Sequence, residues 1–362
     1  MKYIVALDSF KGSLTSIVAS ETLAQSLQAM GKETVCLPVS DGGDGMIDAL
    51  YHSMKGWKKV ECRVHDALMR SCPAEYLLKG DQAILESAQA CGLLKVKDEE
   101  LRPLLATSYG VGEMLMHAIY KGARNIIIGL GGTATSDCGL GMLKGFKDAF
   151  LRTRGIFDPL FKTWQDVEPF LNSLNLKITL ASDVSNPLTG PQGAANVFAP
   201  QKGATAEDVK LLERKAVSFA TMSARHFGFD RSENPGAGAA GGLGYAFMQY
   251  FNADMQSGAE LILSLIHFDD YLAAEPCVVY TGEGKADKQT LMGKLPFVVL
   301  QHCKKYGAKC ILIAGKVEDK QLLLDAGFND IICINDSSTS MEEAMKPENA
   351  KRNLSLSVKP RE

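Results

Sequence analysis

Strings rich in glycine and aspartate recur along almost the whole of this chain, and their residue types suit the binding of phosphorylated ligands. Glycine lets a backbone approach a ligand closely, and clustered N–H groups at a loop or helix N-terminus attract anions. Aspartate beside such loops is the usual carrier of Mg²⁺ in phosphate sites. The strings include Asp8–Ser13, Ser40–Gly45, Gly129–Asp137, Asp183–Gly190 and Thr281–Asp287. Their combination predicts an enzyme that acts on phosphorylated ligands.

The first two strings follow short apolar runs. In Asp8–Ser13, Lys11 could hold a phosphate or a substrate carboxylate, and Asp8 could hold a metal ion or a hydroxyl. A capped helix start with a solvated Lys11 is the structural alternative. In Ser40–Gly45, here called the aspartate loop, Asp41 and Asp44 flank two glycines. An acidic turn without function is an equally good interpretation of that loop.

The string Gly129–Asp137, here called the glycine loop, lies between a predicted strand and a predicted helix. That arrangement presents main-chain N–H groups to phosphate. The string lacks the Gly-Lys-Ser/Thr ending of a Walker loop, so it is not one. A tight structural turn is the alternative, but glycines followed by the hydroxyls of Thr133, Thr135 and Ser136 favour a functional loop.

Further acids stand at the predicted ends of later strands. Asp183 and Asn186 follow one strand, and Glu283 and Asp287 follow another, with Lys294 beyond them. Several carboxylates from different strand ends are what a Mg-nucleotide site needs, although each alone is more often a solvated loop acid.

Other chemistries are poorly supported. The string Gly236–Gly241 matches a dinucleotide-binding pattern, but Ser232–Pro235 precedes it where a strand is required. A closely packed entry to a helix over Gly242–Phe251, or a donor of N–H groups to a site, is the better interpretation. The histidines lack metal-ligand spacing, and no Gly-x-Ser-x-Gly string supports a hydrolase triad.

The elements that must position these loops form two patterns. Near the N-terminus the sequence predicts a strand at Tyr3–Leu7, a helix over Ile17–Met30 capped by Thr15 or Ser16, and a strand at Thr34–Val39. The C-terminal part repeats this β-α-β order, which indicates a parallel sheet. Its predicted strands are Cys277–Thr281, Cys310–Ala314 and Ile331–Ile334, and its predicted helices are Pro296–Tyr306 and Glu318–Ala326.

The middle of the chain predicts a mixed sheet. Strands at Lys59–His65, Glu75–Leu78 and Ala83–Glu86 pair as antiparallel neighbours, the last two across a Lys-Gly-Asp turn. A helix over Gly112–Tyr120 and strands at Asn125–Gly129 and Lys177–Ala181 follow. We therefore predict an α/β protein with two unlike α/β domains: a parallel, Rossmann-like domain over 1–66 and 276–362, and an inserted mixed α/β domain over 67–275.

Composition excludes several classes of protein. The net charge of −3 and the absence of a long Lys/Arg run argue against nucleic-acid binding. The nine cysteines show no Cys-x-x-Cys spacing and read as reduced thiols. The start is too short and too soon acidic for a signal peptide, and no apolar run approaches the ~20 residues of a membrane span. A soluble, cytoplasmic protein that binds neither membrane nor nucleic acid is expected.

Taken together, the strings resemble the glycerate kinase type-1 family, in the same order and over about residues 2 to 340. Besides the loops quoted above, the resemblance rests on Ala106-Thr-Ser-Tyr-Gly-Val-Gly-Glu113, Asn186–Gly193, Val197–Gly203, Pro235–Gly244 and Thr281–Thr290. The sequence departs from relatives within Gly145–Phe170, at Lys285 and in the tail from Lys346 to Glu362. The resemblance implies ATP-dependent phosphorylation of D-glycerate with Mg²⁺, a product that is usually 2-phosphoglycerate in bacterial members, and a fold of two unlike α/β domains.

On this resemblance the roles are assigned as expectations. The glycine loop, with Gly236–Gly244, is expected to cradle the phosphates of ATP, and one of Asp8, Asp41, Asp44 and Asp183 to accept the proton of the glycerate hydroxyl. The expected catalytic residues are Asp8, Lys11, Asp183 and Asp287, and the expected metal ligands are Asp183, Glu283 and Asp287. The expected substrate- and phosphate-binding residues are Ser9, Gly12, Ser13, Asp41, Gly42, Gly43, Asp44, Gly131, Gly132, Thr133, Thr135, Asn186, Lys202, Gly238, Gly241 and Lys294.

Two alternatives stay open at this point. The chain could phosphorylate another small hydroxy acid, or it could be a non-catalytic sensor of a sugar acid or nucleotide. The sequence does not decide which hydroxyl of glycerate reacts, which aspartate is the base, or the oligomeric state.

Overall fold

The structure is a computed structural model that describes residues 1–153, 164–336 and 338–358. The chain divides into two compact units, each of which is described by itself. The first, here called the parallel unit, contains Met1–Asp41, Asp48–Lys55 and Gly258–Glu362, and the second, here called the mixed unit, contains Gly42–Ile47 and Gly56–Ser257. The described residues contain no helix that is both long and apolar enough to cross a membrane.

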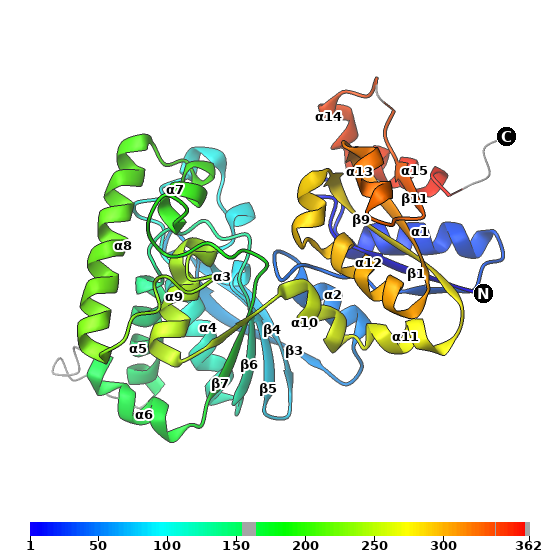
Figure 1. The fold of residues 1–362 in the computed structure, drawn as a ribbon. Helices are drawn as coiled ribbons and strands as arrows, with labels where there is room; N and C mark the ends of the chain where they lie inside the picture. The colour runs from blue at the N-terminus through cyan, green and yellow to red at the C-terminus, as the bar shows by residue number, and fades with distance from the viewer. Residues whose placement is uncertain (154–163, 337, 359–362) are drawn as a thin grey trace. The chain divides into compact units, whose positions relative to one another are not determined.

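The parallel unit is built on a sheet whose described strands run in the order β11-β10-β9-β1-β2, all parallel. Figure 1 labels β1, β9 and β11 of this sheet. In the register, Tyr3 lies between Thr34 on one side and Val278 on the other. The strands are β1 (Lys2–Leu7), β2 (Thr34–Cys36), β9 (Cys277–Ala286), β10 (Lys309–Val317) and β11 (Asp330–Cys333). The helices are α1 (Ser16–Ala29), α2 (Met46–Ser53, which begins in the mixed unit), α10 (Gly258–Leu265), α11 (Phe268–Ala274), α12 (Leu295–Tyr306), α13 (Lys320–Asp325), α14 (Met341–Ala344) and α15 (Pro347–Leu356).

Local sequence explains how the first helix is placed on this sheet. The hydroxyl of Thr15 accepts the N–H of Val18 and caps α1, as the sequence predicts. Leu23 and Leu27, one helical turn apart, are buried against β1 and against α15. The turn that holds Asp8–Ser13 is therefore fixed between a buried strand and a buried helix.

The mixed unit is built on a sheet whose described strands run in the order β3-β4-β5-β6-β7-β8. The pairs β3–β4 and β4–β5 are antiparallel, and the remaining pairs are parallel. The strands are β3 (Lys58–His65), β4 (Ser71–Lys79), β5 (Gln82–Glu86), β6 (Asn125–Gly129), β7 (Lys177–Ala181) and β8 (Asp254–Gln256). The helices are α3 (Ala88–Cys91), α4 (Tyr109–Tyr120), α5 (Leu140–Thr153), α6 (Glu168–Ser173), α7 (Ala194–Phe198), α8 (Ala206–Phe227) and α9 (Ala239–Phe251).

The predicted fold class is confirmed: one sheet is parallel and the other is mixed. The Lys-Gly-Asp turn joins β4 to β5, with Lys79 opposite Gln82. The change of unit at residue 56 and the return at residue 258 lie before the domain limits of 66 and 276 suggested by the sequence. The sequence departs from relatives within Gly145–Phe170 and in the tail from Lys346 to Glu362, and both stretches lie partly outside the described residues.

Three predicted strand ends are wrong. The strand from Thr34 ends at Cys36 and not at Val39, and β10 continues past Ala314 to Val317. The expected strand Cys277–Thr281 continues to Ala286, because every residue from Val278 to Ala286 except Gly284 has a parallel partner in β10. Glu283 is therefore a strand residue paired with Ala314 of β10, and not a residue of the loop that follows.

Candidate functional site

In the parallel unit, the turn after β1 lies against the middle of β9. The N–H of Asp8 donates to the carbonyl of Gly282 at 3.0 Å. A Cβ built on Gly284 would lie 3.1 Å from the N atom of Lys11. Asp8 and Lys11 therefore sit beside the stretch of β9 that carries Glu283, which is the arrangement expected where parallel strands end next to each other.

Asp8 has the most perturbed carboxyl of this group. Burial raises its pKa well above the usual range, and the negative charges of Asp41 and Glu283 raise it further. The N–H of Ser9, which donates to Asp8 Oδ1 at 2.6 Å, and the charge of Lys11 oppose that rise. A carboxyl with a raised pKa beside a cation suits proton transfer close to neutral pH.

Glu283 is 9% exposed and is held by two donors. It accepts the hydroxyl of Thr290 at 2.7 Å and the ammonium of Lys294 at 3.2 Å. Burial raises the pKa of Glu283, against the lowering effect of Thr290 and Lys294. The structure therefore brings Glu283 and Lys294 together.

Asp287 is placed differently from Glu283. It accepts the N–H of Gln289 at 2.8 Å and caps the 3₁₀ helix Lys288–Met292, and it pairs with Lys285 at 3.2 Å. Desolvation acts to raise the pKa of Asp287, but these donors outweigh it and the pKa is lowered. Asp287 is therefore held as an anion in a capping role.

The rest of the Asp8–Ser13 turn is self-contained. The hydroxyl and the N–H of Ser13 both donate to the carbonyl of Phe10, at 2.9 and 2.8 Å. Gly12 has a left-handed backbone, with φ of 82°, and its nearest neighbour is the flexible end of Met345. Ser13 and Gly12 thus shape the turn, while Ser9 supplies the N–H that reaches Asp8.

In the mixed unit, the glycine loop packs directly on the aspartate loop. A Cβ built on Gly131 would lie 2.6 Å from the Cα of Gly43, and one built on Gly132 would lie 2.1 Å from Oδ2 of Asp44. The buried carboxylate of Glu86 accepts the N–H groups of Gly45 and Ile47, each at 3.1 Å. Loop-to-loop contact alone therefore requires glycine at 131 and 132.

Two hydroxyls of the glycine loop are buried with nothing to bond. Thr133 is 4% exposed and Ser136 is 6% exposed, and neither Oγ has a hydrogen-bond partner among the described residues. The backbone around them is anchored, since Leu93 N–H donates to Gly132 O and Ala134 N–H donates to Cys91 O. Buried polar atoms are normally paired, so these two hydroxyls indicate a place for a polar ligand.

Lys202 lies beneath the same loop. Its ammonium donates to the carbonyl of Thr135 at 2.5 Å, and the residue is 4% exposed. Burial lowers the pKa of Lys202 to about 8, while Cys91 and Asp137 act to raise it. A sequence gives no signal for such burial, because lysine is usually an exposed residue.

The Gly236–Gly241 string is closely packed against neighbouring main chain. A Cβ on Gly238 would lie 2.3 Å from the carbonyl of Pro187, and one on Gly241 would lie 2.0 Å from the carbonyl of Thr135. The N–H of Gly238 donates to the carbonyl of Asn186, whose side chain donates to Gln192 O. Asn186 and Gly238 are thus brought together, and Gly241 adjoins the glycine loop.

Asp183 belongs to the mixed unit, whereas Glu283 and Asp287 belong to the parallel unit. Asp183 accepts a hydrogen bond from the hydroxyl of Ser257 at 2.7 Å, and Ser257 is the last residue of the mixed unit. Among the described residues, no group of three or more His, Cys, Asp or Glu side chains has the geometry of a metal site.

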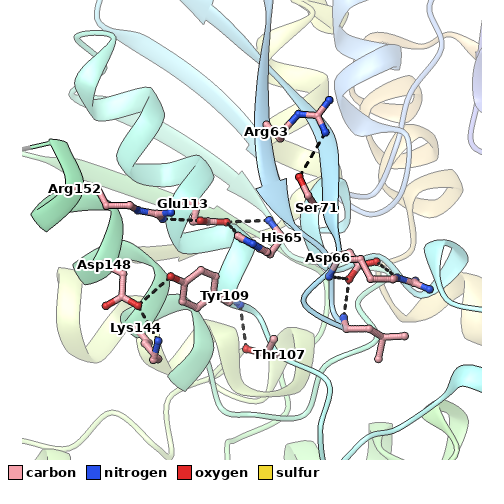
Figure 2. A network of polar contacts seen from close by, with 12 residues as sticks. Arg63, His65, Asp66, Ser71, Thr107, Tyr109, Glu113, Lys144, Asp148 and Arg152 are labelled. Atoms are coloured by element: carbon pink, nitrogen blue, oxygen red, sulfur yellow. Dashed lines mark hydrogen bonds and ion pairs between the residues drawn. The ribbon is translucent and has the colours of Figure 1, made fainter.

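A polar network around Glu113 was missed by the sequence reasoning (Figure 2). Glu113 is buried and accepts the N–H and Nδ1 of His65, both at 2.9 Å, and Nη2 of Arg152 at 2.6 Å. Nearby, Tyr109 Oη donates to Asp148 at 2.9 Å. This network ties β3, α4 and α5 together. Glu113 ends one of the strings quoted above, but nothing in the string shows that its carboxylate is buried.

The chain is similar over nearly its full length to known kinases. The model of the glycerate kinase family matches residues 3–359. A glycerate kinase of Bacillus subtilis (strain 168) is 34% identical, covering 99% of this chain and 98% of that one, and a glycerate 2-kinase of Escherichia coli (strain K12) is 33% identical, covering 96% and 93%. A crystal structure described as a glycerate kinase 2 from Salmonella typhimurium LT2 superposes with a TM-score of 0.76 at 31% identity, covering 98% of this chain and 96% of that one.

These matches define the class: the protein is a kinase, an enzyme built on two α/β units. The chain belongs to the glycerate kinase family. The alternative of a non-catalytic sensor is therefore excluded.

Proposed function

We propose that the enzyme transfers the γ-phosphoryl group of ATP to D-glycerate and that the product is 2-phosphoglycerate. The observation that carries the phosphate assignment is the pair of buried, unbonded hydroxyls at Thr133 and Ser136. Phosphoryl transfer depends on positioning and charge neutralisation more than on covalent chemistry. A glycine loop with spare hydroxyl donors suits that requirement, and its relatives named above support glycerate as the acceptor.

The proposed roles divide between the two units. In the parallel unit, Asp8 accepts the proton of the reacting hydroxyl, because its raised pKa and its place beside Lys11 suit a base. Lys11 holds the glycerate carboxylate or the transferred phosphate, with Ser9, Ser13 and Asp41 around it. In the mixed unit, the glycine loop, Asn186 and Gly238 hold the nucleotide phosphates, with the aspartate loop packed behind Gly131 and Gly132.

Mg²⁺ is part of this proposal. Mg²⁺ in kinase sites is commonly held by one or two carboxylates together with substrate phosphates. The candidate ligands are Glu283 and Asp287 in the parallel unit and Asp183 in the mixed unit, and a bound ion would supply positive charge against the phosphates. Lys294 and Lys285 now neutralise the first two of these acids.

A coupled assay tests the proposal directly. ADP release should require both D-glycerate and Mg²⁺, and glycerol should not replace glycerate, because a cation left without its carboxylate partner discriminates strongly. Enolase and pyruvate kinase convert 2-phosphoglycerate without a mutase, so the mutase requirement identifies the product. Equal rates with glycerol would exclude a carboxylate-specific kinase. A faster reaction with another hydroxy acid would replace glycerate as the substrate.

A further inference from the structure

A buried lysine beside the glycine loop is unusual, and Lys202 has very little exposed surface with which to reach a ligand directly. It ends the 3₁₀ helix Pro200–Lys202 and is 4% exposed. Removing an ammonium from water is costly unless it is paired. Its hydrogen bond, 2.5 Å from Nζ to the carbonyl of Thr135, joins it to the centre of the glycine loop.

The residues on either side of that bond point to a ligand. Thr133 and Ser136 flank Thr135 in sequence, and both of their hydroxyls are buried without a partner among the described residues. A positive charge bonded to the main chain between them favours an anion at those hydroxyls, because Coulomb attraction is strong where water is excluded.

We propose that Lys202 is a positioning residue of the kinase reaction, which fixes the glycine loop through the Thr135 carbonyl and supplies the buried positive charge that draws the phosphates of ATP to Thr133 and Ser136. This inference rests on the proposed function, namely that the glycine loop binds nucleotide phosphates. It replaces the expectation that Lys202 itself contacts the substrate.

Burial makes the charge of Lys202 titratable near pH 8, and the titratable groups that face it oppose that effect. Cys91 on α3 and Asp137 in the glycine loop are the two that act on it, and Gly241 of α9 packs on the same carbonyl without charge. Burial raises the pKa of Cys91 to about 12, so that thiol stays neutral near pH 8. Asp137 accepts the N–H groups of Ser108, Gly139 and Gly141, which fix its carboxylate in place.

A neutral amine keeps the hydrogen bond but loses the charge. Burial lowers the pKa of Lys202 to about 8, so raising the pH through that value removes its proton. The loop geometry should survive because an –NH₂ group still donates to the Thr135 carbonyl. The affinity for a polyanion should then fall while the fold is unchanged. Lys202→Arg would keep its charge across the same range, because guanidinium does not titrate there.

The test compares the parent with Lys202→Met and Lys202→Arg from pH 6.5 to 9.5, with Lys210→Met as a control from an exposed site on α8 of the same unit. Lys202→Met should raise KM for ATP by roughly 10- to 100-fold at pH 7, with KM for glycerate unchanged, since bonds to charged groups are worth that much. The parent's KM for ATP should rise above about pH 8, and that of Lys202→Arg should stay flat. Lys210→Met should match the parent throughout.

Binding of tripolyphosphate, followed by calorimetry, reads the same charge without turnover. If the parent shows no ATP-dependent activity, the proposed function fails, and this measurement still decides the role of Lys202. The inference is overturned if folded Lys202→Met binds tripolyphosphate as tightly as the parent does. It is also overturned if Lys202→Arg loses affinity for tripolyphosphate at the same pH as the parent. Circular dichroism shows whether Lys202→Met is folded. If it is unfolded, the parent decides alone: a KM for ATP that stays constant as the pH rises through 8 overturns the inference equally.

Discussion

The two units carry polar loops beside their parallel strands but equip them with different chemistry. In the parallel unit the groups are charged: Asp8 interacts with the charges of Asp41, Glu283 and Lys11, and Lys294 pairs with Glu283. In the mixed unit the groups are small and close-packed. Gly132 meets Asp44, Gly241 meets Thr135, and a single buried ammonium, that of Lys202, underlies the described glycine loop.

The difference shows how each unit tolerates change. Charges act over several ångströms, so the parallel unit tunes pKa values with groups that need not touch. Glycines and buried hydroxyls act by contact, so the mixed unit depends on distances of a few tenths of an ångström. This contrast supports assigning proton transfer to the first unit and phosphate binding to the second, as proposed above.

The largest expected effect is that of Asp8→Asn in the parallel unit. Loss of a general base should lower kcat by about 10²- to 10⁴-fold, with KM for ATP little changed. The parental kcat should also fall as the pH drops through the raised pKa of Asp8, because the base must be ionised. Steady-state kinetics from pH 5 to 8 measure both effects.

The control for this prediction is Asp270→Asn, at a side chain of the same unit that is 83% exposed. It should leave kcat unchanged. Near-parental kcat in Asp8→Asn would instead direct attention to Asp41, Asp44 or Asp183 as the base.

A smaller effect, on stability, is expected from Gly→Ala substitutions in loops of the two units. Gly132, Gly12 and Gly190 all have left-handed backbones, with φ of 61°, 82° and 88°. Alanine at each should cost about 1–2 kcal/mol for that backbone. At Gly132 the carboxylate of Asp44 blocks the new Cβ, so an overpacking cost of roughly 1–3 kcal/mol should be added.

Gly190 and Gly12 separate the backbone cost from the overpacking cost. Gly190 has open space around its Cβ position, and Gly12 faces only the flexible end of Met345, so both variants should show little beyond the backbone cost. Urea midpoints of the three variants measure the difference. If Gly132→Ala is no less stable than Gly190→Ala, the two loops of the mixed unit are not in the close contact described.

The smallest effect contrasts one histidine from each unit. His302 of the parallel unit bonds Asp269 through Nδ1 and Glu260 through Nε2. Burial lowers its pKa, but the two acids outweigh burial and the pKa is raised. Its contribution to stability is therefore full below the unfolded pKa of about 6.5 and is lost as the pH rises through the raised folded value.

His117 of the mixed unit behaves in the opposite way. Burial lowers its pKa, assisted by Lys121, and its Nδ1 bonds Tyr76 Oη at 3.0 Å. Its contribution is present above the unfolded pKa and is lost as the pH falls through the lowered folded value. His302→Gln should thus lose more stability at pH 6 than at pH 9, and His117→Gln the reverse. Urea unfolding at the two pH values measures this, and parallel behaviour of both variants would contradict it.

Local signals in the sequence were enough for most elements. Thr15 as the cap of α1, the Lys-Gly-Asp turn between β4 and β5, and the strand before the glycine loop depend only on near neighbours. The strand Cys277–Thr281 was cut short because Gly282 and Gly284 read as loop residues. In the structure, a Cβ on Gly282 would lie 2.0 Å from the carbonyl of Ile313 in β10, and one on Gly284 would lie 3.1 Å from the N atom of Lys11, so these glycines make room for neighbouring main chain.

The order of the glycine and aspartate strings determined the family, because it is written along the chain and needs no contacts. Only the tertiary structure decided what those residues do to one another. It placed Asp44 against Gly132, paired Glu283 with Lys294, and buried Lys202 under Thr135, which lies 67 residues away in the sequence. Burial and charge depend on neighbours that folding brings from distant segments, and these neighbours set the pKa of a carboxyl or an ammonium. Spacing in the sequence carries no record of them.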